Sequence, residues 1–492
     1  MLSRLRPWLA RDAEGGQRSA RPPSADRARR GPGPLRRAAA VWIVLFAAYA
    51  ATIGIPAFGT SQYGGDEPHF LLIAESIVSD HDIDLNDEYA SRAYADWYPY
   101  RLERHGQLTD GRADEPHGIG FALLIAPAYA IGGPVAVQLF LAAIAALAFT
   151  LAAALARWIV PEPWATGAAL ACGLSPPALA YGTAVYPELT GGALLAGAAL
   201  LALNARERPR IRRVAGCALM LAALPWLDLS LVIGGLVVAL ALLRWLRRRA
   251  RRFAMVVATE IMLFSGIVYV TINDRLFGGL TPLAADVGAH PLGSASFPGN
   301  YADRAPRLVG LWLDRTYGAL RWAPVLALAF FAVWLLWRSR RDHVARAIPD
   351  RRGVEVAATL CALVCGAQVL VATWLAPTMV GFWFPGRYLL PAFPLAAALC
   401  AWGLQRAPRA GGVLIALTLV TSAWMYVALR LDGGAFIGPS TRAPLGPLDG
   451  ALPLFGAGGA GQTIALAAAG AGLAGLVVSE WRHHRGAARL GP

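Results

Sequence analysis

The chain has 492 residues, of which 56% are hydrophobic and 15% are charged, and its mean hydropathy is +0.47. This composition excludes an ordinary soluble enzyme and is typical of a protein with many membrane-spanning helices. The net charge of +14 comes from 45 arginines, because the chain contains no lysine. These arginines gather in an N-terminal tail and in clusters between apolar runs, so we predict membrane lipids, and no nucleic acid, as partners.

Residues 1–37 are rich in Arg, Pro, Gly and Ser and show no hydrophobic periodicity. We expect them to form a disordered basic tail on the cytoplasmic side of the membrane. They lack the apolar core and the small-residue cleavage site of a signal peptide. The first apolar run, Ala38–Phe58, should therefore remain in the protein as a membrane helix.

Eleven further apolar runs approach the ~20 residues that a bilayer-spanning helix needs. They lie near residues 135–156, 164–184, 189–205, 211–227, 229–246, 253–273, 322–337, 354–376, 388–405, 411–430 and 462–481. One more stretch, 119–133, is shorter and contains Pro127. We predict that it forms a juxtamembrane or re-entrant helix that does not cross.

The positions of the arginines support this topology. If the N-terminus is cytoplasmic and 119–133 does not cross, every later basic cluster faces the cytoplasm, as the positive-inside rule requires. We therefore predict an all-α polytopic protein of the bacterial cytoplasmic (inner) membrane, with about twelve transmembrane helices within residues 38–481. A short cytoplasmic tail, 482–492, should follow the last helix.

Three polar loops would lie on the outer face, and most acidic residues fall in this part of the predicted topology. The loops are 59–117, 274–321 and 431–461. The first loop is bracketed by two copies of the tetrapeptide Asp-Glu-Pro-His, at Asp66–His69 and Asp114–His117. Ionisable groups held this close to a membrane indicate a functional site by default.

The residues that follow Pro68 carry apolar side chains at helical spacing, which predicts an amphipathic helix lying on the outer surface. Asp66 would stand at the N-terminus of this helix, where a carboxylate is a favoured cap. Capping explains Asp66 but leaves Glu67 and His69 unexplained, so we favour a functional cluster.

Three later segments place polar groups at predicted outer ends of helices. They are Tyr186-Pro187-Glu188, the run from Phe384 to Pro391, and His117-Gly118-Ile119-Gly120. Together with the acidic pair Asp66-Glu67 after the first membrane helix, this set resembles the GT-C glycosyltransferases. That family includes the protein O-mannosyltransferases and the lipid A aminoarabinose transferases. Its members carry a proline after the histidine of the third segment, and this chain departs from the pattern there.

The resemblance implies a GT-C-like bundle with juxtamembrane helices in the first outer loop and an active site at the outer membrane surface. Such enzymes move a sugar from a polyprenyl-phosphate carrier to a glycan, lipid or protein acceptor, and they invert the anomeric centre. By resemblance, Asp66 would be the general base, and Glu67 and Glu188 would orient substrate or balance charge. His69 and His117 would line the site.

Transfer from a phosphate-linked sugar needs a carboxylate to deprotonate the acceptor and a cation to stabilise the departing phosphate. We predict that Arg387 and Tyr388, at the outer end of a helix, bind the carrier phosphate. An interface anchor that snorkels among aromatic residues is an equal alternative for Arg387. Arg315, in the second outer loop, is a further candidate for substrate binding, with an ordinary interfacial ion pair as the favoured alternative.

We predict no certain cofactor, although a divalent metal is an open alternative. Carboxylates and imidazoles suit Zn²⁺ or Mn²⁺, and such an ion would use Asp66, Glu67 and His69. Consecutive carboxylates point in different directions, so we favour a site without metal. A transporter or lipid flippase and a catalytically inactive polysaccharide-assembly partner are the alternatives to an enzyme. The chain shows no clear internal repeat, which argues against a transporter.

Overall fold

The computed structural model describes residues 33–106, 108–109, 112–113, 115–286, 301–339, 349–437, 452–455 and 460–489. Most of the predicted tail 1–37 lies outside these residues, as does Asp114 of the second tetrapeptide. The chain divides into two units, Met1–Ala39 and Ala40–Pro492. Of the first unit, residues 33–39 are described, and they contain the start of helix α1 (Pro34–Ala50).

The second unit is built almost entirely of helices. Its longer helices are α4 (Ile119–Ala156), α5 (Trp164–Gly173), α7 (Pro187–Glu207), α8 (Ile211–Leu227), α9 (Val232–Arg248), α10 (Arg252–Phe277), α13 (Ala327–Ser339), α14 (Pro349–Leu370), α15 (Phe393–Arg406), α16 (Pro408–Leu431) and α18 (Ala460–Arg489). Short helices connect them: α6 (Pro176–Tyr181), α11 (Arg307–Leu313), α12 (Ala319–Trp322), the π-helix η8 (Val371–Leu375), and the 3₁₀ helices η2 (Leu229–Leu231), η3 (Pro282–Asp286), η5 (Ala302–Arg304), η6 (Pro324–Leu326) and η9 (Arg387–Ala392).

Within the described residues, eight helices are long and apolar enough to cross a membrane. They are Ile119–Ala156, Pro187–Glu207, Leu229–Arg248, Arg252–Ala284, Gly353–Leu375, Arg387–Arg406, Pro408–Leu431 and Ala460–Val478. The predicted all-α polytopic membrane protein is thereby confirmed. The other four predicted spans correspond to shorter elements, namely α1, α5 with α6, α8, and the stretch Pro324–Ser339. The total of twelve spans stays a prediction.

Helix α4 is broken where the short stretch 119–133 was expected to end. Gly132 and Gly133 leave the helical conformation, and Gly133 has φ +61° and ψ −155°, which is accessible essentially only to glycine. Pro134 follows at once, where its missing N–H costs little because the helix is already interrupted. The chain can therefore change direction between residues 119–131 and 134–156. That residues 119–131 do not cross the membrane stays a prediction.

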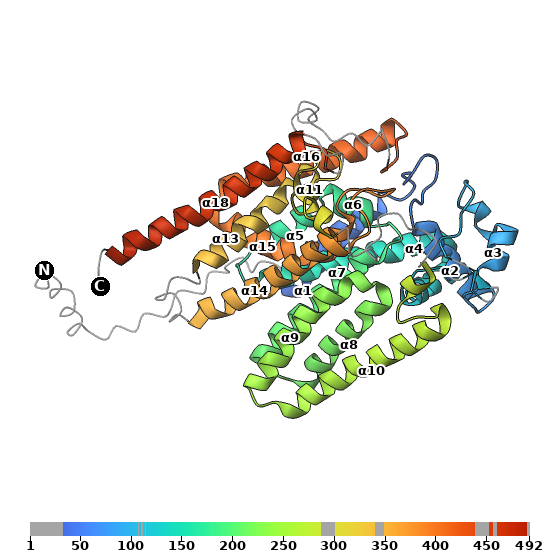
Figure 1. The fold of residues 1–492 in the computed structure, drawn as a ribbon, viewed down its shortest axis with the longest axis horizontal. Helices are drawn as coiled ribbons and strands as arrows, with labels where there is room; N and C mark the ends of the chain where they lie inside the picture. Colours follow the sequence, from blue (N-terminus) through green and yellow to red (C-terminus); the bar gives the residue numbers. More distant parts are fainter. Residues whose placement is uncertain are drawn as a thin grey trace, which may run out of the picture. The chain divides into compact units, whose positions relative to one another are not determined.

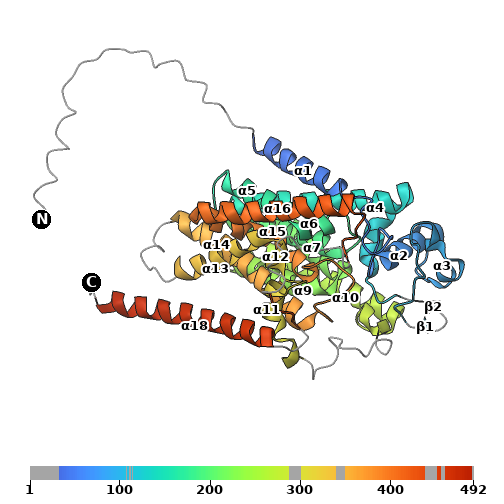
Figure 2. The same cartoon turned by 90° about the horizontal axis from the view of Figure 1, so that it is seen from above.

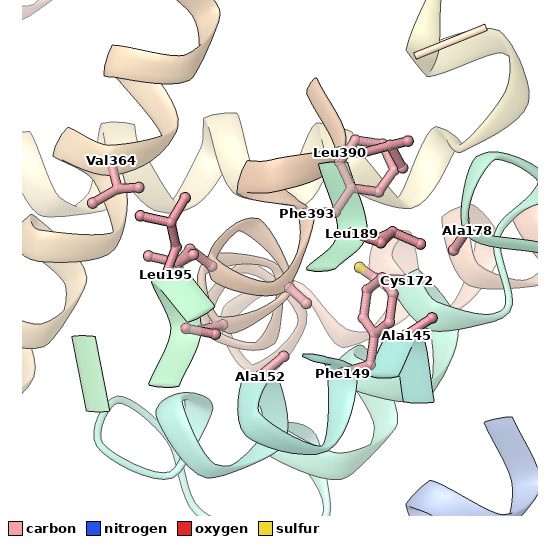
Figure 3. Close-up of a cluster of buried hydrophobic side chains, with 14 of the residues drawn as sticks. Ala145, Phe149, Ala152, Cys172, Ala178, Leu189, Leu195, Val364, Leu390 and Phe393 are labelled. Carbon is pink, nitrogen blue, oxygen red and sulfur yellow. The ribbon is translucent and has the colours of Figure 1, made fainter. Parts of the chain in front are cut away.

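Small residues let the central helices approach closely. Helix α4 packs against α2, α5, α7 and α15, and α7 also packs against α8 and η9. Figure 3 shows Ala145 and Phe149 of α4 beside Cys172 of α5, in the same cluster as Phe393 of α15. Without a strong hydrophobic drive between helices in lipid, such packing of small and branched side chains supplies most of the attraction. Helices α8, α9 and α10 lie side by side next to α7 (Figure 1).

The first polar loop folds into its own cluster of short elements. These are α2 (Glu67–Ser79), α3 (Asn86–Ser91), η1 (Ala93–Asp96) and an antiparallel hairpin of β1 (Leu108–Thr109) and β2 (Arg112–Ala113), in which Leu108 pairs with Ala113. They gather at one end of the long helices (Figures 1 and 2). The juxtamembrane helices expected in this loop are therefore present as helices.

Two expectations about helices differ from the structure. Helix α2 is not a surface helix with one buried face, because every residue from Glu67 to Ala74 is buried. It packs against α4, while a second apolar cluster around Leu85, Tyr94 and Leu102 covers another side. Helix α18 continues to Arg489, past residue 482 where the tail was expected to begin, although its apolar span ends at Val478, so the tail boundary itself stays a prediction. Hydropathy falls there, but alanine and arginine sustain a helix without apolar packing.

Candidate active site

Three charged side chains from distant parts of the chain meet at the base of the first loop. Arg387 Nη2 lies 2.7 Å from Asp66 Oδ2, and Arg387 Nε lies 2.6 Å from Glu188 Oε1. Asp66 precedes α2, Glu188 lies in the first turn of α7, and Arg387 opens η9. We call Asp66, Glu188 and Arg387 the ion triad. The structure thus joins three residues that the sequence analysis named as candidates.

Asp66 occupies the N-cap position of α2, yet its side chain makes no capping hydrogen bond. Its carboxylate turns to Arg387 instead, so the capping interpretation is wrong. Burial alone would raise the pKa of Asp66, but Arg387, His117 and His105 together hold it well below its usual range. With 24% of its side chain exposed, Asp66 is the most accessible member of the ion triad.

Arg387 is enclosed by aromatic rings. Its Cζ atom lies 4.1 Å from the ring centre of Tyr186, 5.0 Å from Trp383 and 5.5 Å from Tyr388. The residue is 7% exposed, and a buried guanidinium is stable only when it is paired and well packed. The alternative of an anchor that snorkels to the surface is therefore excluded. Tyr388 joins the site as part of this aromatic enclosure.

Glycine is required next to Asp66. Gly65 has φ +57°, and a Cβ atom there would lie 2.9 Å from the carbonyl oxygen of Phe382 and would also collide with the Tyr186 hydroxyl. The close approach lets Tyr186 Oη donate to Gly64 O at 2.8 Å and accept from the Asp66 N–H at 3.3 Å. The backbone around Asp66 is thereby held against the start of α7.

Glu67 uses both carboxylate oxygens on backbone amides. Oε1 accepts a hydrogen bond from Val185 N at 2.7 Å, and Oε2 accepts from Gly64 N at 2.8 Å. Burial raises the pKa of Glu67 to about 7, although these two amides favour its charged form. Glu67 therefore ties the first loop to the connection between α6 and α7. The geometry makes it a positioning residue instead of one that contacts reacting atoms.

A second polar group lies beside the ion triad. His69 Nδ1 lies 2.9 Å from Tyr89 Oη and 3.4 Å from Glu115 Oε1, and Tyr89 donates a hydrogen bond to Glu115 Oε1. His105 stacks on His69 with 3.7 Å between ring centres, and the backbone N–H of His105 donates to Glu115 Oε1 at 3.3 Å. His117 lies 6.0 Å from His69, ring to ring. We call His69, His105, Glu115 and His117 the imidazole cluster.

Charge and burial act together on the pKa values in this cluster. Burial lowers the pKa of His105 to about 4, and the neighbouring imidazoles add to the shift. Burial likewise lowers the pKa of His117. For Glu115, burial alone would raise the pKa, but contacts with His69, His117 and Tyr89 bring it to about 2. Burial thus disfavours the charged forms of His105 and His117, whereas the surroundings of Glu115 favour its charged form.

His105 and the role of Glu115 were not predicted from the sequence. Glu115 belongs to the second tetrapeptide, but His117 drew attention there because of the family resemblance. His105 stands in a polar stretch without any repeated pattern, and only the folding of the loop brings it onto His69. Arg315, in contrast, does not join the site. Its Nε donates to Leu452 O at 3.0 Å, because the second and third outer loops pack on each other.

A small, partly open cleft lies beside the ion triad. Its lining is mostly apolar and aromatic, with four polar side chains that are not aromatic, and comprises Ile55, Ala57, Gln62, Glu67, Gln138, Ala180, Tyr181, Thr183, Ala184, Tyr186, Trp383, Phe384, Phe436 and Ile437. Tyr186 and Trp383 belong both to the cleft and to the enclosure of Arg387. Within the part that the structure describes, the buried Gln138 Oε1 has no hydrogen-bond partner. The cleft thus offers a polar contact beside aromatic walls.

The chain was compared with known proteins. No protein-family model matches it, and no curated protein matches it significantly. The solved structures to which the chain is similar include two of ArnT from Cupriavidus metallidurans. The apo crystal structure is 15% identical, covers 82% of this chain and 74% of that one, and gives a TM-score of 0.47. The structure bound to undecaprenyl phosphate is 14% identical, covers 81% and 74%, and gives a TM-score of 0.46.

Proposed function

We propose that the protein is a membrane glycosyltransferase that moves a sugar from a polyprenyl-phosphate carrier to an acceptor hydroxyl at the outer face of the cytoplasmic membrane. One observation carries the proposal: the buried ion triad lies beside an aromatic cleft, at the end of the bundle where the first loop folds. Charged side chains are costly to bury among membrane helices, so their presence there favours a functional role. Two carboxylates around one guanidinium supply the base and the phosphate contact that such a transfer needs.

In the proposed reaction the acceptor oxygen attacks the anomeric carbon from the side opposite the phosphate. The bond between that carbon and the phosphate oxygen breaks, the anomeric centre inverts, and the polyprenyl phosphate leaves with the bonding electrons. The acceptor proton passes to Asp66. Because Asp66 Oδ2 meets Arg387, Oδ1 is the proposed proton acceptor.

Arg387 is the proposed contact for the carrier phosphate. A guanidinium has five N–H donors, and the two ion pairs occupy only part of this set. A phosphate that approaches Arg387 competes with Asp66 for the cation. A carboxylate that loses a cationic partner becomes a stronger base, so binding of the donor would activate Asp66. The aromatic rings around Arg387 suit the isoprenoid end of the carrier.

Glu188 and Glu67 take different parts in this proposal. Glu188 Oε2 is buried without a hydrogen-bond partner among the described residues, whereas Oε1 meets Arg387. The unpartnered oxygen is suited to accept a hydrogen bond from a substrate hydroxyl. Glu67 acts as a positioning residue, because its oxygens accept hydrogen bonds from backbone amides on both sides of the site.

The test uses purified protein in lipid nanodiscs with a panel of polyprenyl-phosphate sugars. We expect the wild type to release polyprenyl phosphate from one of them, and Asp66→Asn and Glu188→Gln to lower this turnover by at least about 100-fold. Asp80→Asn is the matched control, because Asp80 is an exposed carboxylate at the other end of α2. Turnover that neither site variant lowers would overturn the mechanism. Movement of intact lipid across the bilayer without sugar release would favour the flippase alternative.

A further inference from the structure

The imidazole cluster holds a set of metal-binding groups that the proposed transfer does not use. Ligand atoms of His69, His105 and Glu115 all lie within 4.8 Å of one another. His69 comes from α2, His105 from the loop after η1, and Glu115 from the segment that leads into α4. His69 is 1% exposed and Glu115 is 4% exposed, so these side chains point into the protein.

Two imidazoles and one carboxylate are a ligand set that divalent transition metals, Zn²⁺ above all, take readily. Such an ion binds nitrogen and oxygen at about 2.0–2.2 Å. The ligand atoms lie within 4.8 Å of one another, a spacing from which a modest inward shift would bring them onto one ion. The chemistry and the spacing therefore agree.

The hydrogen bonds of Tyr89 orient the ligands. Tyr89 donates its proton to Glu115 Oε1, so the contact with His69 Nδ1 is satisfied when that nitrogen carries a proton and donates to Tyr89 Oη. In this tautomer the Nε2 lone pair of His69 is free to bind a metal. A ligating histidine whose other nitrogen is held in this way is the usual arrangement around a protein-bound metal.

Two buried atoms point independently to a missing partner. Glu115 Oε2 and His117 Nε2 have no hydrogen-bond partner among the residues that the structure describes. Buried polar atoms are nearly always satisfied, so each such atom requires an explanation. The charged-group contact of Glu115 is with His69 at 3.4 Å, and a buried carboxylate is costly unless it is paired with a cation and fully hydrogen-bonded. A divalent cation meets both needs.

We propose that His69, His105 and Glu115, with His117 as the fourth ligand, bind a divalent transition metal of the Zn²⁺ class. The site clamps three segments of the first loop around one ion. Ligand atoms of Asp66, His105 and His117 also lie within 4.8 Å of one another. The metal site would therefore hold in place the loop residues that lie next to the ion triad. The proposal does not rest on the glycosyltransferase function. Of the ligands considered from sequence, it keeps His69 and omits Asp66 and Glu67.

Metal content tests the proposal directly. The full chain, purified without a histidine tag, would be loaded with Zn²⁺, dialysed against a weak chelator and measured by plasma mass spectrometry. We expect about one ion per chain in the wild type, and at least a tenfold loss in His105→Ala and Glu115→Gln. His81→Ala is the matched control, because His81 is an exposed histidine of the same loop. A wild type that keeps no stoichiometric Zn²⁺, or site variants that keep all of it, would overturn the site.

A second measurement covers the case in which a ligand variant fails to fold. The wild type would be stripped of metal and loaded with Co²⁺, whose visible absorption reports the coordination geometry. A four-coordinate spectrum from nitrogen and oxygen ligands, displaced by Zn²⁺ at one equivalent, is the expected result. A six-coordinate spectrum identical to that of aqueous Co²⁺ would contradict the proposal. Neither measurement requires turnover, so its failure is distinguishable from a failure of the proposed function.

Discussion

Arg387 Nη2 lies 2.7 Å from Asp66 Oδ2, which joins the start of the first loop to the start of a late helix. The same guanidinium holds Glu188 at 2.6 Å, so one cation serves two carboxylates. Removing the cation leaves two carboxylates together, whereas removing one carboxylate leaves a paired cation. The ion triad therefore responds unequally to the loss of its members, and this asymmetry can be measured.

Arg387→Ala should be the most damaging change in the ion triad. It leaves the buried Glu188 without its cation, and breaking a buried pair in this way costs about 3–5 kcal/mol. We expect a markedly lower melting temperature in detergent and no detectable carrier turnover. Arg275→Ala is the control, because Arg275 is exposed near the end of α10. A variant as stable as the control would show that the ion triad is not a stabilising element.

Glu67→Gln should lower stability more than it lowers the intrinsic rate. A glutamine keeps one carbonyl oxygen, but its NH₂ group then faces one of the two backbone amides that Glu67 now accepts. Leaving one buried donor unsatisfied costs about 1–3 kcal/mol. Thermal unfolding and kcat would be measured together at a temperature where the variant is folded. A full loss of kcat in a stable protein would instead make Glu67 a catalytic residue.

Gly65→Ala should disturb the site beyond the cost of its backbone conformation. A left-handed conformation costs a non-glycine residue roughly 1–2 kcal/mol. At Gly65 the added methyl also meets Phe382 O and the Tyr186 hydroxyl, and this hydroxyl holds the backbone next to Asp66. Gly278→Ala is the matched control, because Gly278 has φ +67° with open space around it. We expect both variants to lose stability and only Gly65→Ala to lose turnover as well.

Gln138→Leu should separate stability from substrate binding. Gln138 Oε1 is buried, has no hydrogen-bond partner in the described part of the chain, and lies on the cleft. Replacing an unsatisfied polar group by an apolar one of similar size is neutral or stabilising. A substrate hydroxyl that uses this oxygen would bind more weakly, so we expect an unchanged or higher melting temperature with a raised KM. An unchanged KM would exclude Gln138 from substrate contact.

Tyr89→Phe should weaken metal binding without removing a ligand. The phenol orients His69 and Glu115, and loss of such an orienting hydrogen bond typically lowers metal affinity about 10–100-fold. Competition with a fluorescent zinc chelator would give the affinity of wild type and variant. Tyr100→Phe is the control, since Tyr100 is exposed in the same loop and contacts Thr60. Equal affinities in all three proteins would remove Tyr89 from the metal site.

Much of the fold could be predicted from the sequence because a bilayer imposes local rules. Each spanning helix must satisfy its own backbone and present apolar side chains, so hydropathy along the chain locates it. The sequence analysis ended the short stretch at residue 133 and named Pro127 within it, whereas the helix continues through Pro127 and leaves the helical conformation at Gly132 and Gly133. The burial of α2 was not visible, because its apolar residues look alike whether they face lipid, solvent or α4.

The candidate residues of the site were found in part for the same reason. Asp66, Glu188 and Arg387 are charged residues at the ends of apolar runs, and such positions are informative without any contact. Arg315 also stands in a predicted outer loop between apolar runs, but it lies outside the site and donates a hydrogen bond to Leu452 O. His105 had no such position and was missed. A local pattern therefore selected the kind of residue but could not select which of them meet.

By itself, the sequence determined that the protein is a bundle of membrane helices with its ionisable groups gathered between them. Only the tertiary structure decided that Asp66 pairs with Arg387 instead of capping α2, and that Glu67 holds two backbone amides. The physical reason is the distance along the chain over which each kind of interaction acts. Hydropathy and helix signals act over a few residues, whereas an ion pair between α2, α7 and η9 depends on how every intervening helix packs.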